Sequence, residues 1–167
     1  MKITKIILTH YHYDHVQRIN ELIDKTNATA YFHENESDFL KNVIKNKSAK
    51  VIKLKGNETI NIGQIKIKII HTPGHTPGSI CLLIGNKLIT GDTLFVGAIG
   101  RTDLPGGDAL KLFESLKTLK KLEDNVEIYP GHDYGETTSS SIGDEKKNNP
   151  YFKCETKEQF LSLLGLF

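Results

Sequence analysis

A run of metal-binding side chains lies close to the N-terminus. Residues 9–15 read Thr-His-Tyr-His-Tyr-Asp-His, which places three imidazoles and one carboxylate within six residues. Such nitrogen and oxygen ligands suit zinc, iron or manganese. In an extended turn, side chains at alternate positions share a direction, so His10 and His12 can bind one ion together. Asp14 and His15 follow at the predicted start of a helix, where they can face a second ion.

Three further turns each carry one candidate ligand. His75 lies in the turn Thr-Pro-Gly-His-Thr-Pro-Gly-Ser at 72–79, Asp92 follows Gly91, and His132 follows Pro-Gly at 130–131. Proline stiffens such a turn, and glycine lets its backbone approach a ligand closely. All three turns adjoin predicted strands, so each candidate would be held by regular structure.

The elements around the first run form a predicted βαβ unit over residues 3–33. The apolar run 5–8 predicts a buried strand, and apolar residues at 16, 19, 22 and 23 fit one face of a helix. A second strand is predicted at 28–33. Turns after strands of open α/β sheets are where ligands bind. A surface helix is predicted over 34–47.

After the predicted surface helix, apolar and polar residues alternate with a period of two. A hairpin is predicted from 60–62 and 65–69, and a second from 79–84 and 87–90 around Gly85-Asn86. A Gly-rich loop at 97–107 then leads into a predicted helix at 108–122, with Leu110 on its apolar face. A strand is predicted at 126–129. The rest consists of a polar loop at 137–150, which includes the serines at 139–141, and a closing helix at 157–166.

Composition limits the class of protein. The 167 residues suit one domain, 1–167, and the 38% hydrophobic and 25% charged residues are ordinary for a soluble globular protein. The net charge of +2 gives no sign of a nucleic acid or membrane partner. Two isolated cysteines and no apolar leader predict a reduced, cytoplasmic chain.

The order of the four motifs resembles the metallo-β-lactamase superfamily. These motifs are T-H-x-H-x-D-H, P-G-H-T-P-G-S, G-D-T-L-F and P-G-H, and the likeness runs from residue 6 to about residue 150. Residues 100–107 and 145–150 resemble the small glyoxalase II-like hydrolases. The resemblance implies an α/β fold, the αββα sandwich, without the strands that usually precede the first motif.

The resemblance also implies a binuclear centre. One ion would be held by His10, His12 and His75, the other by Asp14, His15 and His132, with Asp92 bridging both. The ions would be zinc, with iron and manganese as alternatives, and Asp14 and Asp92 would be catalytic. Two such ions lower the pKa of a shared water towards ~7 and deliver a bridging hydroxide to a carbonyl. A thiolate leaves readily, so a small thioester such as hydroxyacylglutathione is the expected substrate, with other esters as alternatives.

Two residues are candidates for substrate contacts. Arg101 could bind a substrate carboxylate in a bidentate pair, or it could be a surface turn residue. Tyr134 could reach the substrate, although a packing role is the simpler expectation. His33 and His71 are expected to be structural.

Other functions compete with the hydrolase. Persulfide dioxygenases resemble the same motifs, and they would use His10, His75 and Asp92 as a facial triad for a single iron. Flavodiiron oxygen reductases resemble the first motif less, because they carry a glutamate where His12 stands. The nucleases of the superfamily are disfavoured because no basic patch is evident. A non-catalytic metal-binding module is the alternative from another class.

The position of the first motif predicts an unusual sheet. Because the chain starts at the strand that carries the motif, we expect the strand at 3–8 to have an open edge, which is a template for pairing with another chain. Either Met1 is an internal methionine of a longer protein, or a second chain completes the sheet as a homo-oligomer. The helical extension with which full-length glyoxalase II holds glutathione is also missing from this sequence.

Overall fold

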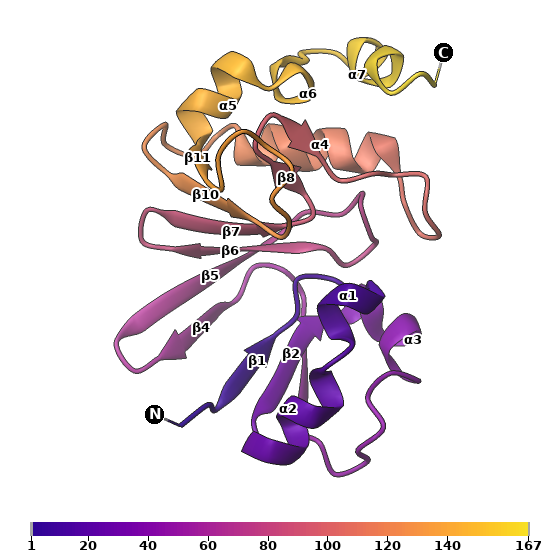
Figure 1. Cartoon of the computed structure of the whole chain (residues 1–167), viewed down its shortest axis with the longest axis vertical. Coiled ribbons are helices and arrows are strands. Elements are labelled where there is room, and N and C mark those ends of the chain that lie inside the picture. The colour runs from indigo at the N-terminus through magenta and orange to yellow at the C-terminus, as the bar shows by residue number, and fades with distance from the viewer. Residues whose placement is uncertain (1, 167) are drawn as a thin grey trace.

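Two β-sheets pack face to face, and helices cover the outer side of each sheet (Figure 1). The computed structural model describes residues 2–166. Apolar side chains of both sheets meet between them, among them Ile7 and Tyr31 from one sheet and Ile60, Ile67 and Ile69 from the other. This is the predicted αββα arrangement.

The smaller sheet has the order β1-β2-β3 and the larger one β11-β10-β7-β6-β5-β4. A separate two-stranded ribbon pairs β8 with β9. The strands are β1 (Lys5–Ile7), β2 (Thr29–His33), β3 (Val51–Leu54), β4 (Thr59–Ile62), β5 (Ile65–His71), β6 (Ile80–Ile84), β7 (Lys87–Gly91), β8 (Leu94–Phe95), β9 (Ala98–Ile99), β10 (Glu127–Pro130) and β11 (Ser140–Ser141).

The helices divide into two outer layers (Figure 1). One layer consists of α1 (Tyr13–Val16), α2 (Ile19–Thr26), the 3-10 helix η1 (Glu34–Glu36) and α3 (Ser37–Leu40); the other consists of α4 (Ala109–Leu119), α5 (Ile142–Asn148), α6 (Pro150–Lys153) and α7 (Lys157–Leu163). The first layer packs on β1 and β2 through Val16, Ile19 and Ile23. The second packs on β6, β7 and β10, with Leu112, Leu116 and Leu119 of α4 fully buried.

The predicted βαβ unit is confirmed, because β1 and β2 pair in parallel with Ile6 opposite Ala30. Both hairpins are confirmed as well. The helix predicted to follow the first run is divided in two: α1 ends at Val16, a turn follows at 17–18, and α2 begins at Ile19. On α4, Leu112 takes the buried position expected of Leu110, which is 44% exposed.

The helix predicted over 34–47 is wrong beyond Leu40. The side chain of Asn20 on α2 donates to the carbonyl of Val43 and accepts from the amide of Lys45, both at 2.8 Å. These bonds satisfy backbone groups that a helix would otherwise pair internally. The chain then enters β3, a strand that the periodicity did not reveal.

The loop predicted over 137–150 is also wrong, because it contains β11, α5 and the start of α6. Ser141 caps α5 by accepting from the amide of Asp144 at 3.0 Å, and Asn149 caps α6 in the same way. Burial of Ile142 and of the Glu145 side chain fixes α5 to the molecule. These two short helices were not predicted, because their polar capping residues are also typical of loops.

Within the described residues, β1 pairs with β2 and with no other strand, so the predicted open edge is confirmed. Thr4 and Leu8 hydrogen-bond to β2. Backbone groups alternate in direction along a strand, so the N–H and C=O of Lys5 and Ile7 point to the free side. No helix in the described part of the chain is long and apolar enough to cross a membrane.

Candidate metal centre

The candidate ligands gather where four strands end. β5, β7 and β10 run in the same direction, since β7 and β10 are parallel and β5 is separated from β7 by one antiparallel strand. The turns after these strands carry His75, Asp92 and His132. The turn after β1 joins them from the other sheet through a 2.9 Å hydrogen bond from the Ile80 amide to the Thr9 carbonyl.

Local structure separates the ligands of the first run into two groups. His10 and His12 precede α1, and the extended backbone of His12 leads into its first residue, Tyr13. Asp14 and His15 lie on α1 itself. The sequence-based expectation that Asp14 and His15 lie at a helix start is confirmed.

Glycines bring the backbone unusually close to the ligands. A Cβ atom on Gly131 would lie 2.3 Å from Oδ1 of Asp92, and one on Gly100 would lie 3.0 Å from Nδ1 of His75. Gly91 has a φ of 51°, the left-handed region, and a Cβ there would lie 2.8 Å from Thr9. The glycines beside Asp92 and His132 therefore allow the three turns to converge.

The first ligand group consists of His10, His12 and His75, whose ligand atoms lie within 4.8 Å of one another. Nδ1 of His12 lies 2.9 Å from Nε2 of His75. Nδ1 of His75 bonds to the carbonyl of Arg101 at 2.8 Å, which leaves Nε2 directed at the site. A ligand histidine held through its second nitrogen has a fixed ring orientation.

The second ligand group consists of Asp14, His15 and His132. Nε2 of His15 and Nε2 of His132 are 3.1 Å apart, and Nε2 of His132 lies 3.1 Å from Oδ2 of Asp14. This group is more exposed than the first, because the side chain of Asp14 is 53% accessible whereas His10 is almost fully buried.

Asp92 lies between the two groups. Its carboxylate oxygens are 3.6 Å from Nε2 of His75, 3.3 Å from Nε2 of His15 and 3.4 Å from Nε2 of His132. Oδ2 of Asp92 is 4.0 Å from Nε2 of His10. One carboxylate thus faces both sets of imidazoles, as the bridging role inferred from the resemblance requires.

Unpaired atoms show that these residues fit a metal. Nε2 of His10 and Oδ1 of Asp92 are buried without a hydrogen-bond partner, an arrangement that costs free energy unless a bound ion satisfies both atoms. Two nitrogens bound tetrahedrally to one zinc ion lie about 3.3 Å apart, close to the nitrogen separations observed here. The donor set of imidazoles and carboxylates is that of zinc, iron or manganese.

Electrostatics favours the metal-binding forms of the imidazoles. Burial and the neighbouring histidines lower the pKa of His10 to about 2. Burial also lowers the pKa of His12, His15 and His75. These rings are therefore neutral at physiological pH and have a free lone pair to offer. Burial raises the pKa of Asp92, while His75 and His132 oppose that rise.

A pocket of about 310 Å³ opens above the ligands. Besides the ligands, its lining combines apolar side chains with two polar ones: Phe95, Ala98, Ile99, Leu104, Arg101 and Tyr134. The guanidinium of Arg101 is engaged by Asp103 through two 2.7 Å hydrogen bonds. Tyr134 is 68% exposed and stacks on His132, with 5.1 Å between ring centroids. Both residues line the pocket, and their role in substrate binding stays a prediction.

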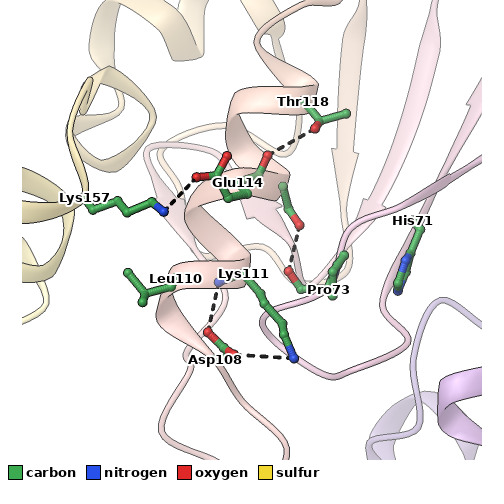
Figure 2. Close-up of a pocket in the computed structure, with 9 residues that line it drawn as sticks. His71, Pro73, Asp108, Leu110, Lys111, Glu114, Thr118 and Lys157 are labelled. Atoms are coloured by element: carbon green, nitrogen blue, oxygen red, sulfur yellow. Dashed lines mark hydrogen bonds and ion pairs between the residues drawn. The ribbon is translucent and has the colours of Figure 1, made fainter.

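A second groove, of about 460 Å³, lies along α4 behind the turn that carries His75 (Figure 2). Figure 2 shows its charged side chains paired with each other: Lys111 with Asp108 at 3.5 Å, and Lys157 with Glu114 at 3.3 Å. The same view shows Pro73, whose carbonyl accepts a 2.7 Å hydrogen bond from Ser115 of α4. This groove therefore supports the turn, and its paired charges make it a poor reaction site.

His33 and His71 lie outside the metal centre, as expected. Their rings stack at 3.7 Å between centroids, and Nε2 of His71 bonds to the carbonyl of Pro77 at 3.0 Å. Sequence reasoning missed the residues behind this pair, above all the fully buried Glu36. In the sequence, Glu36 stands in the polar run Glu-Asn-Glu-Ser directly after a buried strand. Such a run is typical of an exposed turn, so nothing in it pointed to a buried carboxylate.

Comparison with known proteins agrees with this geometry. A family model described as the metallo-beta-lactamase superfamily matches residues 1–132. Together, this match, the two-sheet fold and the ligand clusters define the class. The chain belongs to the metallo-β-lactamase superfamily.

Several relatives are similar over most of the chain. The probable polyketide biosynthesis zinc-dependent hydrolase PksB of Bacillus subtilis is 35% identical over 157 residues, which are 93% of this chain and 68% of that protein. The crystal structure of ETHE1 from Myxococcus xanthus matches with a TM-score of 0.85 and 34% identity, over 99% of this chain and 69% of the other. TTHA1623, solved in a di-iron-bound form, matches with a TM-score of 0.76 and 30% identity, over 88% and 76%.

Proposed function

We propose that this protein is a metal-dependent hydrolase of thioesters, with two divalent ions at the candidate metal centre. The observation that carries the proposal is the pair of complete ligand groups with the Asp92 carboxylate between them. PksB, named as a probable zinc-dependent hydrolase, supports zinc as the metal, and the di-iron-bound form of TTHA1623 supports two ions. The four imidazoles whose pKa is lowered supply neutral ligands.

The candidate ligands would hold two ions, and the ions would supply the chemistry of hydrolysis. When bound, two divalent ions activate water at neutral pH and polarise a substrate carbonyl. His10, His12 and His75 would hold the first ion and Asp14, His15 and His132 the second. The buried position of Asp92 keeps its carboxylate fixed between the groups. A thiolate leaving group needs no protonation, which suits a site where every nearby imidazole is committed as a ligand.

The lining of the pocket supports a proposal for the kind of substrate. Phe95, Ile99 and Leu104 offer an apolar surface for an acyl group. Arg101 is suited to a carboxylate on the substrate, and Tyr134 is placed to contact the substrate at the centre. A small thioester with a carboxylate, of the hydroxyacylglutathione type, matches this combination.

The test begins with metal content, measured by mass spectrometry on protein purified without a chelating tag. We then expect zinc or manganese to support release of thiol from a glutathione thioester, without any need for oxygen. A matched Asp92→Ala variant should release none. Full metal loading with no cleavage of any thioester or ester would contradict the proposal.

The alternative is a persulfide dioxygenase with a single iron. The proximity of His10, His75 and Asp92 favours it, because two histidines and one carboxylate can form the facial triad of a single iron. Oxygen uptake with glutathione persulfide by the iron-loaded chain, together with an absence of thioester cleavage, would establish this alternative.

We also propose a cytoplasmic location. Cys81 and Cys154 are both buried and unpaired, which is the state expected of thiols in a reducing compartment.

A further inference from the structure

A buried carboxylate lies beside the metal centre but outside it. Glu36, the last residue of η1, is 0% exposed, and no lysine or arginine among residues 2–166 forms a salt bridge with it. Burial raises the pKa of its carboxyl, and nearby hydrogen-bond donors act in the opposite direction. A buried carboxylate without a cation is costly, so its retention calls for a specific use.

Glu36 binds the turn that carries His75. Its Oε1 accepts hydrogen bonds from the Thr76 hydroxyl at 3.0 Å and from the Gly78 amide at 2.5 Å. A Cβ on Gly78 would lie 2.5 Å from Cγ of Glu36, so glycine is needed for this approach. The donors lie one and three residues after His75.

The same segment holds the turn at other points. Nδ2 of Asn35 donates to the Pro77 carbonyl at 3.3 Å, and His33 stacks on His71 at the start of the turn. On the opposite side, Ser115 of α4 donates to the Pro73 carbonyl, and the Asp108 amide donates to the Gly74 carbonyl at 2.8 Å. The turn is therefore fixed between α4 and the segment 33–36.

A second connection reaches the first ligand run. Tyr11 lies between His10 and His12 in the first ligand run. The ring of Tyr11 stacks on Phe39 of α3 at 3.9 Å between centroids. Segment 33–39 thus contacts both turns that supply His10, His12 and His75. Within the described part of the chain, the side chain of Glu36 hydrogen-bonds to Thr76 and Gly78, and neither is adjacent to Asp14, His15 or His132.

We propose that Glu36 is a positioning residue for the first metal-binding group, acting by fixing the backbone of the His75 turn. This inference rests on the proposed metal centre. A residue that only stabilised the fold would affect both ligand groups equally. A positioning residue of this kind weakens the first group and leaves the second unchanged.

The experiment measures zinc affinity without substrate in two backgrounds. His132→Ala retains the first ligand group, and His12→Ala retains the second. We expect Glu36→Ala to weaken zinc binding about tenfold or more in the His132→Ala background. In the His12→Ala background it should change affinity less than twofold. Glu36→Gln should recover most of the loss, because the amide oxygen can accept the same two hydrogen bonds.

The matched control is Glu34→Ala, which removes an exposed carboxylate from the same short helix. It should leave both affinities unchanged. If Glu36→Ala fails to fold, Thr76→Val, which removes one of the two donors, should show the same asymmetry. Equal losses in both backgrounds, or no loss in either, would overturn the proposal. Because no substrate is present, an absence of thioesterase activity would leave this result intact.

Discussion

Nδ1 of His12 and Nε2 of His75 lie 2.9 Å apart, although 63 residues separate them in the chain. Burial keeps both rings neutral by lowering their pKa. Two imidazole nitrogens at this distance repel each other unless a proton or a cation lies between them. The fold therefore holds the two rings in an arrangement that a metal ion stabilises.

Asp92→Ala should remove both ions, because the Asp92 carboxylate faces both ligand groups. His132→Ala should lower the metal content from two ions to about one per chain, since it belongs to the second group. Elemental mass spectrometry on the purified variants measures this. Full metal content in Asp92→Ala would show that the ligand assignment is wrong.

Chelation should destabilise the protein. Each ion that binds the folded chain alone raises the free energy of unfolding by about 2.7 kcal/mol at a concentration 100-fold above its Kd. We expect EDTA to lower the melting temperature and added zinc to restore it. Asp92→Ala serves as the control, and its melting temperature should be insensitive to EDTA.

The stability of the protein should carry a pH signature of Glu36. Burial raises the pKa of this carboxyl in the folded protein, so folding favours its neutral form. The stability that this gives is present at acidic pH, and the free energy of unfolding falls as the pH rises through the folded-state pKa. Glutamine cannot ionise. The melting temperature of Glu36→Gln minus that of the wild type should therefore become more positive between pH 4 and pH 8. A pH-independent difference would contradict the raised pKa.

Asp103 should compete with a substrate carboxylate for the guanidinium of Arg101. It engages the guanidinium through two hydrogen bonds, so Asp103→Ala frees both donors. For a thioester that bears a carboxylate, we expect KM to fall in Asp103→Ala and to rise about tenfold in Arg101→Ala, with kcat nearly unchanged. A thioester without a carboxylate is the control substrate. If both substrates respond alike, Arg101 is not the carboxylate contact.

The open edge of β1 should pair with another strand, and we propose that a second copy of this chain supplies it. The outward N–H of Lys5 would be needed for such pairing. Lys5→Pro should abolish it while sparing the bonds to β2. Lys5→Ala is the matched control. Sedimentation velocity should show a dimer for the wild type and Lys5→Ala and a monomer for Lys5→Pro; a monomeric wild type would exclude self-pairing.

Sequence patterns predicted the parts of the fold where periodicity is strong. The alternation at 60–69 and the apolar run at 5–8 predicted strands, and the motif residues His10, His75 and Asp92 converge as the resemblance implied. Such patterns are local, so they are visible in the chain itself.

Tertiary contacts decided the rest. The helix expected over 34–47 ends early because Asn20, far away in sequence, binds the backbone at 43–45. Glu36 looked like a surface residue because its partners Thr76 and Gly78 lie 40 residues or more along the chain. The periodicity of a local stretch of sequence carries no information about contacts between residues so far apart in the chain.

The seven candidate ligands come from both sheets, and this division has a mechanical consequence. His10, His12, Asp14 and His15 extend from the half of the molecule built on β1–β3, whereas His75, Asp92 and His132 extend from the half built on the larger sheet. An ion bound between them would act as a cross-link that closes chain loops of 63 and 117 residues, like a reversible disulfide. Loading the centre would then couple the unfolding of the two halves into one cooperative transition, and emptying it would let each half open independently.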